Sequence, residues 1–482
     1  MAGLQFEKLK RTLSRSALGC LALLGASATG APGAGAQDAV PAAPITTLDQ
    51  AVERAINTQP EVQARWEAFL ASGEDRRAAR GGYLPSIDVR GEFGEASREF
   101  DDRGWFTRDN VELSITQMLF DGFLVRSQLK EADQDRLARY YELLDEVQNK
   151  ALEALEVYED VRQYRQTLAL AQKNYVTHEN VLALIQERAQ SGVSNKADLQ
   201  QASGRLALAE ANLLTERSNL HVVMAHFQRV VGSRPADRLE DFEVASARVP
   251  ADFATVITEA VRHHPNLFAA YATIGAAKAA VSQSNAAYYP KVSVAARSGT
   301  YRNSSGFDSQ FDVRGRGQET FVGLNLSYNL YRGGADKARS NAALRRLSQS
   351  EDLLDKACVD LRQSASIAWN NVNTLKAKLS ALEVHRAGAT DVADAYEKQF
   401  YIGRRTLLDV LDAKNEAFQA ERAHAQARHE LTKAYYRTLH AMGILLDVLG
   451  QSREGMPAIS DFDDDAVPPA SIDCGALMAS SN

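Results

Sequence analysis

The residues best suited to chemistry in this sequence are its histidines, several of which occur in close pairs. These pairs are His221 with His226, His263 with His264, and His424 with His429. None of them fits the His-Glu-x-x-His pattern that places two zinc ligands on one helix face. The sequence also contains no Walker phosphate-binding loop and no Gly-x-Ser-x-Gly nucleophile turn. We therefore expect no catalytic residue, no metal site and no cofactor, and we predict that the chain is not an enzyme.

The net charge argues against a nucleic-acid-binding protein, and the number of cysteines argues against a disulfide-rich protein. The 482 residues carry a formal net charge of −7, which is too small and too scattered to favour a nucleic-acid partner. Three cysteines do not make a disulfide framework. Cys20 lies in the leader described next, so only Cys358 and Cys474 remain. We expect these two to be free thiols, with a bridge between them as the alternative.

Residues 1–36 have the features of a secretory signal peptide. Basic residues precede a short apolar run, Ala17 to Ala26, and Ala34-Gly35-Ala36 fits the small-residue cleavage site before Gln37. A lipid anchor on Cys20 is the alternative, but polar residues occupy the place where its apolar run would have to lie. After the leader, no apolar stretch is long enough for a transmembrane helix.

The chain contains an internal duplication. Tyr83-Leu84-Pro85 returns as Tyr288-Tyr289-Pro290, 205 positions later, and Leu119-Phe120-Asp121-Gly122 returns as Leu330-Tyr331-Arg332-Gly333, 211 positions later. Landmarks that recur in one order at nearly one offset indicate a repeat.

The duplication sets the expected domain organisation. A signal peptide at 1–36 precedes a first repeat at 37–240 and a second repeat at 241–450. An acidic, flexible C-terminal tail at 451–482 follows, because several aspartates and two prolines cluster there.

Each repeat contains two segments with strand-like alternation of apolar and polar residues. The expected strands are about 85–96 and 110–120 in the first repeat, and about 290–301 and 320–331 in the second. Such alternation is typical of outer-membrane barrel strands, although a half-buried sheet of a soluble domain alternates in the same way. Four strands cannot close a barrel, and unpaired backbone groups are costly in lipid. Strands that span a membrane would therefore have to be pooled from several chains.

Each repeat ends in a pair of long helices. No proline interrupts the segment from Asp121 to Gly192, and its apolar residues recur at spacings of three and four, as in a coiled coil. Lys196–Val231 is expected to run back beside it. The second repeat is expected to do the same with Ala335–Tyr401 and Thr406–Leu449.

Each repeat also opens with an interrupted helix. Thr47-Leu48-Asp49-Gln50 has the pattern of a capping box, which marks a helix start. Pro60 and Pro265 are each expected to begin a second helix, because proline is tolerated in a first helical turn.

These features together resemble the TolC family of outer-membrane channel proteins. The resemblance rests on the leader, the duplication, the paired strands, the Leu-Phe-Asp-Gly turn and the segment from Phe400 to Ala413, and it extends to about Gly450. It implies a mostly α-helical fold with a membrane β-barrel. Three chains would each contribute four strands to a twelve-stranded barrel in outer-membrane lipid, continued by a helical tunnel across the periplasm of a Gram-negative bacterium.

The resemblance also implies a function and partners. The segment around Gly403, followed by Asn415-Glu416, is most similar to the type I secretion branch. The homotrimer would then be the exit duct for an inner-membrane ABC transporter and a periplasmic adaptor protein. One alternative is the outer-membrane channel of a drug or metal efflux system, with a proton-driven pump. A second alternative is a soluble periplasmic coiled-coil scaffold.

The family's gate residues carry over to four positions. Asp409 and Asp412 match the paired aspartates that line the closed periplasmic entrance, where rings of carboxylates favour cations and raise one another's pKa. Arg405 matches an arginine that ties neighbouring helix pairs shut, and Asp198 matches its acidic partner. The alternative for all four is a solvated helix surface with weak salt bridges.

The remaining expectations concern aromatic residues and turns. Phe400 stands where relatives have a tyrosine and cannot make that hydroxyl hydrogen bond, so Tyr401 is the candidate replacement. The turns are expected to meet the adaptor, although glycine is also the common helix stop. The residues assigned to these docking tips are Gly192, Val193, Ser194, Gly403 and Arg404.

Overall fold

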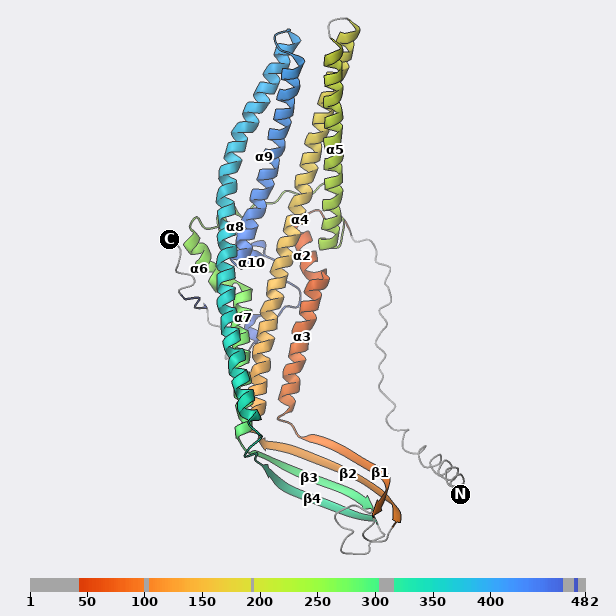
Figure 1. Cartoon of the computed structure of the whole chain (residues 1–482), viewed down its shortest axis with the longest axis vertical. Helices are drawn as coiled ribbons and strands as arrows, with labels where there is room; N and C mark the ends of the chain where they lie inside the picture. Colours follow the sequence, from red (N-terminus) through yellow and green to blue (C-terminus); the bar gives the residue numbers. More distant parts are fainter. Residues whose placement is uncertain (1–42, 99–103, 192–194, 303–315, 463–471, 476–482) are drawn as a thin grey trace, which may run out of the picture. The chain divides into compact units, whose positions relative to one another are not determined.

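The computed structural model describes residues 43–98, 104–191, 195–302, 316–462 and 472–475. All the elements named below belong to one compact unit, Pro44–Asn482 (Figure 1). The expected signal peptide lies outside the described residues.

The two repeats contain the same elements in the same order. The first consists of α2 (Leu48–Thr58), α3 (Pro60–Gly81), β1 (Ser86–Arg98), β2 (Gly104–Phe120), α4 (Leu124–Gln190) and α5 (Lys196–Val231). The second consists of α6 (Phe253–His263), α7 (Pro265–Asn285), β3 (Lys291–Arg302), β4 (Arg316–Ser327), α8 (Ala335–Tyr401), α9 (Leu407–Ala441) and the short α10 (Leu445–Leu449). The four strands per chain and the long helix pairs are confirmed.

The expected helix starts are confirmed as well. The Thr47 side chain accepts a hydrogen bond from the backbone of Gln50, whose own side chain caps the Thr47 backbone in return. Pro60 and Pro265 each occupy the start of a helix. Proline fits there because the first-turn N–H groups have no partner within the helix.

The strands form one antiparallel sheet in the order β1-β2-β3-β4, so the pairing of β2 with β3 joins the two repeats. One face of the sheet is apolar and exposed: in β4, Val322, Leu324 and Leu326 are 71%, 67% and 72% exposed. Two predicted strand ranges were wrong at their ends. β2 begins at Gly104, well before 110, and β4 ends at Ser327 rather than 331, before the turn at Gly333.

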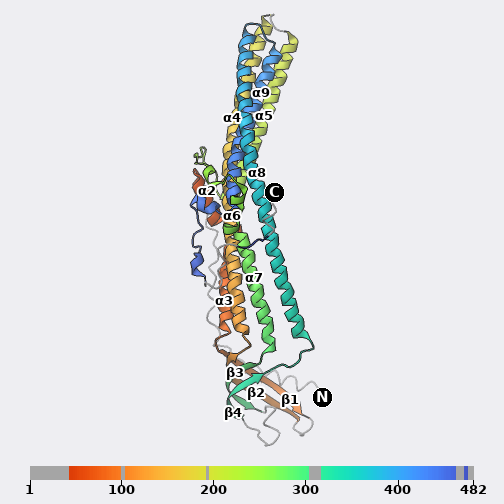
Figure 2. The same ribbon diagram turned by 90° about the vertical axis from the view of Figure 1, so that its left-hand side faces the viewer.

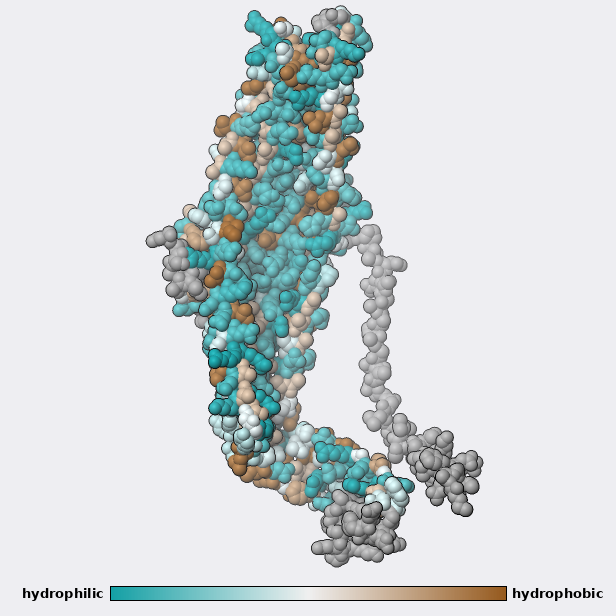
Figure 3. All heavy atoms as spheres, viewed as in Figure 1, coloured by the Kyte–Doolittle hydropathy of each residue, from teal (hydrophilic) through white to brown (hydrophobic). Residues whose placement is uncertain are grey.

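The helices pack side by side beyond the sheet (Figures 1 and 2). α4 lies against α3, α5, α7 and α9, and α8 lies against α7 and α9. The Tyr158 side chain of α4 is fully buried, and its hydroxyl donates to the carbonyls of Thr46 and Glu240 at 2.9 and 2.8 Å. In the view of Figure 3, hydrophilic residues cover most of the helical surface. None of the described helices combines the length and hydropathy that crossing a lipid bilayer requires.

The last long helix is shorter than predicted. α9 ends at Ala441, and Gly443 adopts φ of +76° before the chain re-enters a helix at Leu445. A Cβ at Gly443 would lie 2.6 Å from the backbone carbonyl carbon of His263, so a helical side chain has no room there. The continuous helix expected over Thr406–Leu449 is therefore divided by a backbone contact with the end of α6.

The prediction of two free thiols was also wrong. Cys358 of α8 and Cys474 form a disulfide bond, and both residues are buried. Phe462 packs against the rings of Phe69 and Tyr140. Two parts of the expected tail, residues 451–462 and 472–475, are therefore joined to the helices by an apolar contact and by a covalent bond.

Replacing both bridged cysteines tests how strongly the bond stabilises the fold. Cys358 and Cys474 are 116 positions apart, and closing a loop of roughly that length is worth about 4–5 kcal/mol in the chain-entropy model. We expect Cys358→Ser/Cys474→Ser to lower the free energy of unfolding of detergent-extracted protein by about 2–5 kcal/mol. Denaturation in urea measures the change. Reduced wild type should behave like the variant, and the variant should not respond to reductant; equal midpoints before and after reduction would contradict the prediction.

A half-buried histidine pair predicts a loss of stability in mild acid. His264 and His440 lie 6.3 Å apart between ring centres, and the His440 ring is 2.9 Å from the amide oxygen of Asn149. Burial lowers the pKa of each ring from 6.5 to about 4, and His440 lowers that of His264 further. Between pH 6.5 and 4 the unfolded chain binds protons that the folded chain excludes, so stability falls with pH in that window.

At pH 5, each of the two histidines lowers the free energy of unfolding by about 2 kcal/mol relative to neutral pH. Thermal unfolding of the extracted protein at pH 7.5 and pH 5 measures it. We expect His264→Gln/His440→Gln to flatten this pH dependence, whereas His385→Gln, at an exposed position, should leave it unchanged. A double variant with the wild-type pH dependence would show that other groups cause it.

Candidate functional site at the helix-pair tips

The turn between α8 and α9 is built by a glycine and a capping box. Gly403 adopts φ of +74°, and the Arg404 N–H donates to the carbonyl of Gln399 at 2.9 Å, which ends α8. The Asp409 N–H donates to the Thr406 hydroxyl at 3.2 Å, and the Thr406 N–H donates to the Asp409 carboxylate at 3.1 Å. These reciprocal bonds satisfy N–H groups that a helix start otherwise leaves unpaired.

The first repeat uses the same device at its own tip. The Asp198 N–H donates to the Asn195 side chain at 2.8 Å, and the Asn195 N–H donates to the Asp198 carboxylate at 3.4 Å. Asp198 and Asp409 therefore both stabilise a helix start, a role that the sequence analysis missed. The signal was present, since each aspartate lies three residues after a side chain that caps helices well. Gly192, Val193 and Ser194 lie outside the described residues.

Asp409 is ionised at neutral pH. The hydrogen bonds from the Thr406 side chain and backbone, with a smaller contribution from Arg405, hold the pKa of Asp409 below its usual value. The structure thus gives a lowering of this pKa within one chain. The rise expected from a ring of carboxylates requires several chains and stays a prediction.

Arg405 contacts residues of its own hairpin. Its Nε donates to the Gln399 side chain at 3.0 Å, and its guanidinium lies 4.0 Å from the centre of the Tyr396 ring. One terminal nitrogen is 4.0 Å from the Asp409 carboxylate. These contacts orient Arg405 beside the turn, and its pairing with Asp198 stays a prediction.

Asp412 joins the two hairpins. Its carboxylate forms an ion pair with Arg205 of α5, so the contact runs from the second repeat to the first. Arg205 is a site residue that the sequence analysis missed. It lies seven positions after Asp198, on the same face of α5, and that spacing is the signal that could have identified it.

Phe400 also contacts the other hairpin, without a hydroxyl group. The guanidinium of Arg188 in α4 lies 4.5 Å from the centre of the Phe400 ring, a cation–π geometry. The ring packs on an apolar cluster contributed by α4, α5 and α9, whereas the candidate replacement Tyr401 is 58% exposed. The cluster consists of Val181, Ile185, Ala202, Leu407 and Leu411.

Further from the tips, α4 and α9 share a buried polar network. The His429 ring lies 2.8 Å from a Glu159 oxygen through Nδ1 and 2.9 Å from the Gln166 side-chain oxygen through Nε2. Burial opposes the charge on Glu159, but hydrogen bonds from His429 and Arg162 outweigh it and hold the pKa of Glu159 below its usual value. This network joins α4 to α9 through buried side chains.

Within the described residues, no group of three or more potential metal ligands is found. His424 lies 2.8 Å from Glu383, and His429 lies in the network above, so both rings are engaged with carboxylates. What the site provides is charge and a set of contacts between the ends of two helix pairs.

Comparison with known proteins gives consistent matches over most of the chain. A family model described as "Outer membrane efflux protein" matches residues 51–233 and 256–443. Outer membrane efflux protein BepC of Brucella suis biovar 1 is 27% identical over 405 residues, which cover 84% of this chain and 87% of BepC.

Two further matches are a secretion protein that aligns with less than half of the chain and a solved structure with the same fold. The alkaline protease secretion protein AprF of Pseudomonas aeruginosa is 27% identical over 198 residues, which cover 41% of this chain and 40% of AprF. The solved structure of the outer membrane protein VceC from Vibrio cholerae matches with a TM-score of 0.70 at 17% identity, covering 82% of this chain and 96% of that one.

Reversing the charge of Arg205 tests the contact between the hairpins. Arg205→Glu would place a carboxylate beside Asp412, which turns an attraction worth up to about 1 kcal/mol into repulsion. We expect amide hydrogen exchange in residues 196–206 and 407–415 to accelerate roughly fivefold, because local opening becomes easier. Arg217→Glu, at an exposed position further along α5, is the matched control. Equal exchange in the two variants would contradict a role for Arg205 in holding the tips together.

Proposed function

The chain belongs to the outer membrane efflux protein family, and from that premise we propose that it is the trimeric exit duct of a type I protein secretion system. The family match confirms the resemblance to TolC-type channels. It identifies an outer-membrane channel protein with a periplasmic helical tunnel, and not an enzyme. The alternative of a soluble periplasmic scaffold is thereby excluded.

The observation that best supports the proposal is that the sheet formed by the described residues of one chain has two unpaired edges, which are not tolerated in lipid. β1 and β4 are the edges of the four-stranded sheet, and neither has an outer partner strand within the described residues. Exposed Val and Leu side chains on one face suit contact with lipid, where every backbone polar group must be paired. Pairing of β4 in one chain with β1 in the next would satisfy both edges, and three copies give twelve strands.

The helices support the same assembly. α8 exposes large apolar side chains along its length, which is unusual for a helix that faces only water. Packing against a neighbouring chain would cover them. These residues are Leu344, Val359, Ile367, Val384 and Val392. Channels of this family work as trimers with periplasmic adaptors and inner-membrane transporters.

In the proposed trimer, Asp409 and Asp412 would form two rings of three carboxylates at the periplasmic entrance. Such rings attract cations and exclude small anions. The turns at Gly192 to Ser194 and at Gly403-Arg404 would meet the adaptor. The inner-membrane ABC transporter would supply the energy and choose the cargo, because the chain has no nucleotide-binding loop of its own.

Secretion is favoured over efflux by the segment from Phe400 to Ala413 with Asn415-Glu416, and by similarity to a protein named for protease secretion. A second candidate, the outer-membrane channel of a drug or metal efflux system with a proton-driven pump, is favoured by the longer match to an efflux protein. Deletion of the gene separates them. Loss of one large secreted protein supports secretion, whereas hypersensitivity to drugs or metals alone supports efflux.

Single-channel recording in planar bilayers tests the duct and its entrance together. We expect small, cation-selective openings from the extracted wild type, and a weaker cation preference in Asp409→Ala/Asp412→Ala, because the entrance carboxylates are removed. Asp391→Ala/Asp394→Ala removes two exposed carboxylates of the same spacing from α8 and serves as the control. Protein that never conducts would refute the duct, and unchanged selectivity in the first variant would refute the role of the two aspartates.

A further inference from the structure

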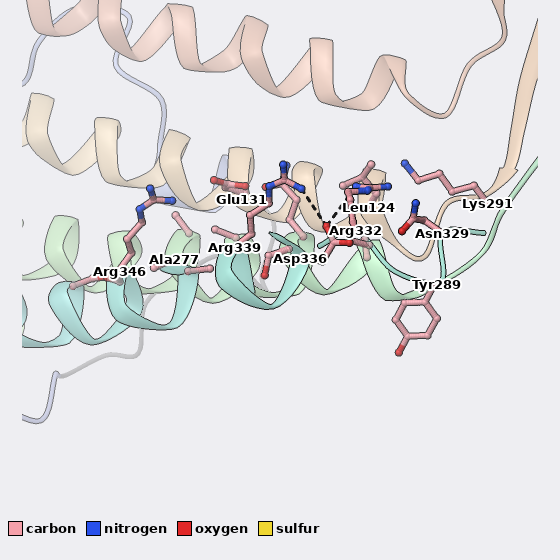
Figure 4. A pocket seen from close by; sticks show the side chains of 18 of the residues that line it. Leu124, Glu131, Ala277, Tyr289, Lys291, Asn329, Arg332, Asp336, Arg339 and Arg346 are labelled. Carbon is pink, nitrogen blue, oxygen red and sulfur yellow. Dashed lines mark hydrogen bonds and ion pairs between the residues drawn. The ribbon is translucent and has the colours of Figure 1, made fainter. Parts of the chain in front are cut away.

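A cleft of about 1100 Å³ lies where the sheet joins the helices. Its walls come from α4, α7 and α8 and from the ends of β3 and β4 (Figure 4). Small side chains of α7, among them Ala276, Ala277 and Ala280, line it and leave it open. The residues of the cleft are distant in sequence from the tip residues of both repeats. None of the candidate gate residues lines it.

Basic side chains dominate the lining of this cleft. Arg339 and Arg346 lie seven residues apart on one face of α8, and Arg332 precedes them by the same interval in the turn before the helix. Lys291, the first residue of β3, adds a fourth cation. Repetition at this interval places the three arginines in a row along the cleft, as Figure 4 shows.

Two carboxylates oppose these four cations. Asp336 lies 3.4 Å from Arg332 and 3.1 Å from Arg339. Glu131 of α4 also lines the cleft, and burial, followed by the charge of Asp135, raises its pKa. With both carboxylates ionised, four cations minus two anions leave an excess of two positive charges.

Three of the cations have donors available to a ligand. Arg339 donates to Asp336 through one terminal nitrogen at 3.1 Å, which leaves the N–H groups of its Nε and its other terminal nitrogen. Among the described residues, no ion pair occupies the side chain of Arg346 or of Lys291. Uncharged donors stand beside them, including the side chains of Asn329 and Gln349. Guanidinium and amide groups that converge on one space suit carboxylate or phosphate oxygens, because charge-assisted hydrogen bonds to such groups are the strong ones.

The register of the sheet shows which way the cleft opens. Lys291 pairs with Ser327 across β3 and β4, and both line the cleft. The next pair, Val292 with Leu326, projects to the opposite face because side chains alternate along a strand. Leu326 belongs to the exposed apolar face of the sheet, which is the face suited to lipid. The cleft therefore opens on the polar face, which in a closed barrel is the lumen.

We propose that this cleft is a binding site in the channel wall for anionic groups of the passing substrate, with Arg339 and Arg346 as its main ligands. The inference rests on the proposed function, since it takes the polar face of the sheet to be the lumen of a trimer. Three such clefts would then surround the lumen where the helical tunnel meets the barrel. Acidic segments of a substrate would dwell there, and small polyanions would compete for the same positions.

Block of single-channel current by tripolyphosphate tests the site. We expect the wild type to show block that Arg339→Gln/Arg346→Gln weakens about tenfold in half-blocking concentration, because two charge-assisted contacts are lost. Arg345→Gln, which changes the exposed neighbouring arginine outside the cleft, should change the value less than twofold. Glu131→Gln should strengthen block about threefold, since it removes an opposing charge.

The outcomes separate this inference from the proposed function. If no protein conducts, the duct fails, and calorimetric titration of the extracted protein with tripolyphosphate still tests the cleft on its own. If the channel conducts but tripolyphosphate block changes equally in Arg339→Gln/Arg346→Gln and in Arg345→Gln, the cleft is not the anion site. A neighbouring chain that fills the cleft would give this result. A lipid headgroup is the other source of an anion for this cleft. Recording the block in neutral lipid, and again in lipid that contains phosphatidylglycerol, distinguishes the two sources. Block that anionic lipid abolishes would assign the cleft to a lipid headgroup and overturn the proposal.

Discussion

A backbone that enters lipid must pair all of its N–H and C=O groups within protein, and this constraint governs the whole architecture. The four strands of one chain satisfy it only between neighbours, because β1 and β4 each keep one open edge. Each repeat contributes one hairpin, and the β2–β3 pairing joins the two hairpins into one sheet. The long helices that follow each hairpin then have to pack as a continuous wall, because the strands dictate where each of them begins.

The contacts that hold this wall together differ in kind along its length. Near the middle, α4 and α9 share buried charges: Glu159 is satisfied by His429 and Arg162, and Lys433 lies 2.6 Å from Asp160. Removing one partner there would leave an unpaired buried charge, which is costly. At the tips the links between hairpins include the half-exposed pair of Arg205 with Asp412, the cation–π contact of Arg188 with Phe400 and a small apolar cluster. Such contacts are weak and easily exchanged, so motion is expected to be concentrated at the tips.

Local sequence signals predicted the elements well, because they act within a few residues. The capping box at Thr47 and the prolines at the starts of α3 and α7 gave the helix boundaries, and α5 and α8 match the predicted Lys196–Val231 and Ala335–Tyr401. The errors depended on distant contacts. Gly443 breaks the last helix because the backbone at His263 occupies the space of a side chain. Nothing local indicates that contact, and the same holds for a disulfide whose cysteines lie 116 positions apart.

The candidate site shows the same division. The family motif indicated Asp198, Asp409 and Asp412, but it gave no hint that two of them also cap the helices on which they stand. Arg205 and Arg188 were missed because their partners lie on the other hairpin, and only the packing of α4 and α5 against α8 and α9 brings them together.

The capping role has a consequence for the electrostatics of the proposed duct. An aspartate that caps its own helix is held ionised by bonds to backbone and hydroxyl groups, so its charge persists well below neutral pH. The arginines of the cleft are charged at any physiological pH. Within one chain, neither the charge of Asp409 nor that of the cleft arginines depends on a titration near neutrality, whereas a ring of carboxylates in the proposed trimer would oppose the lowering of the pKa of Asp409. A substrate with both acidic and basic segments would meet fixed charges of opposite sign in sequence, and its own charge pattern would decide where it pauses.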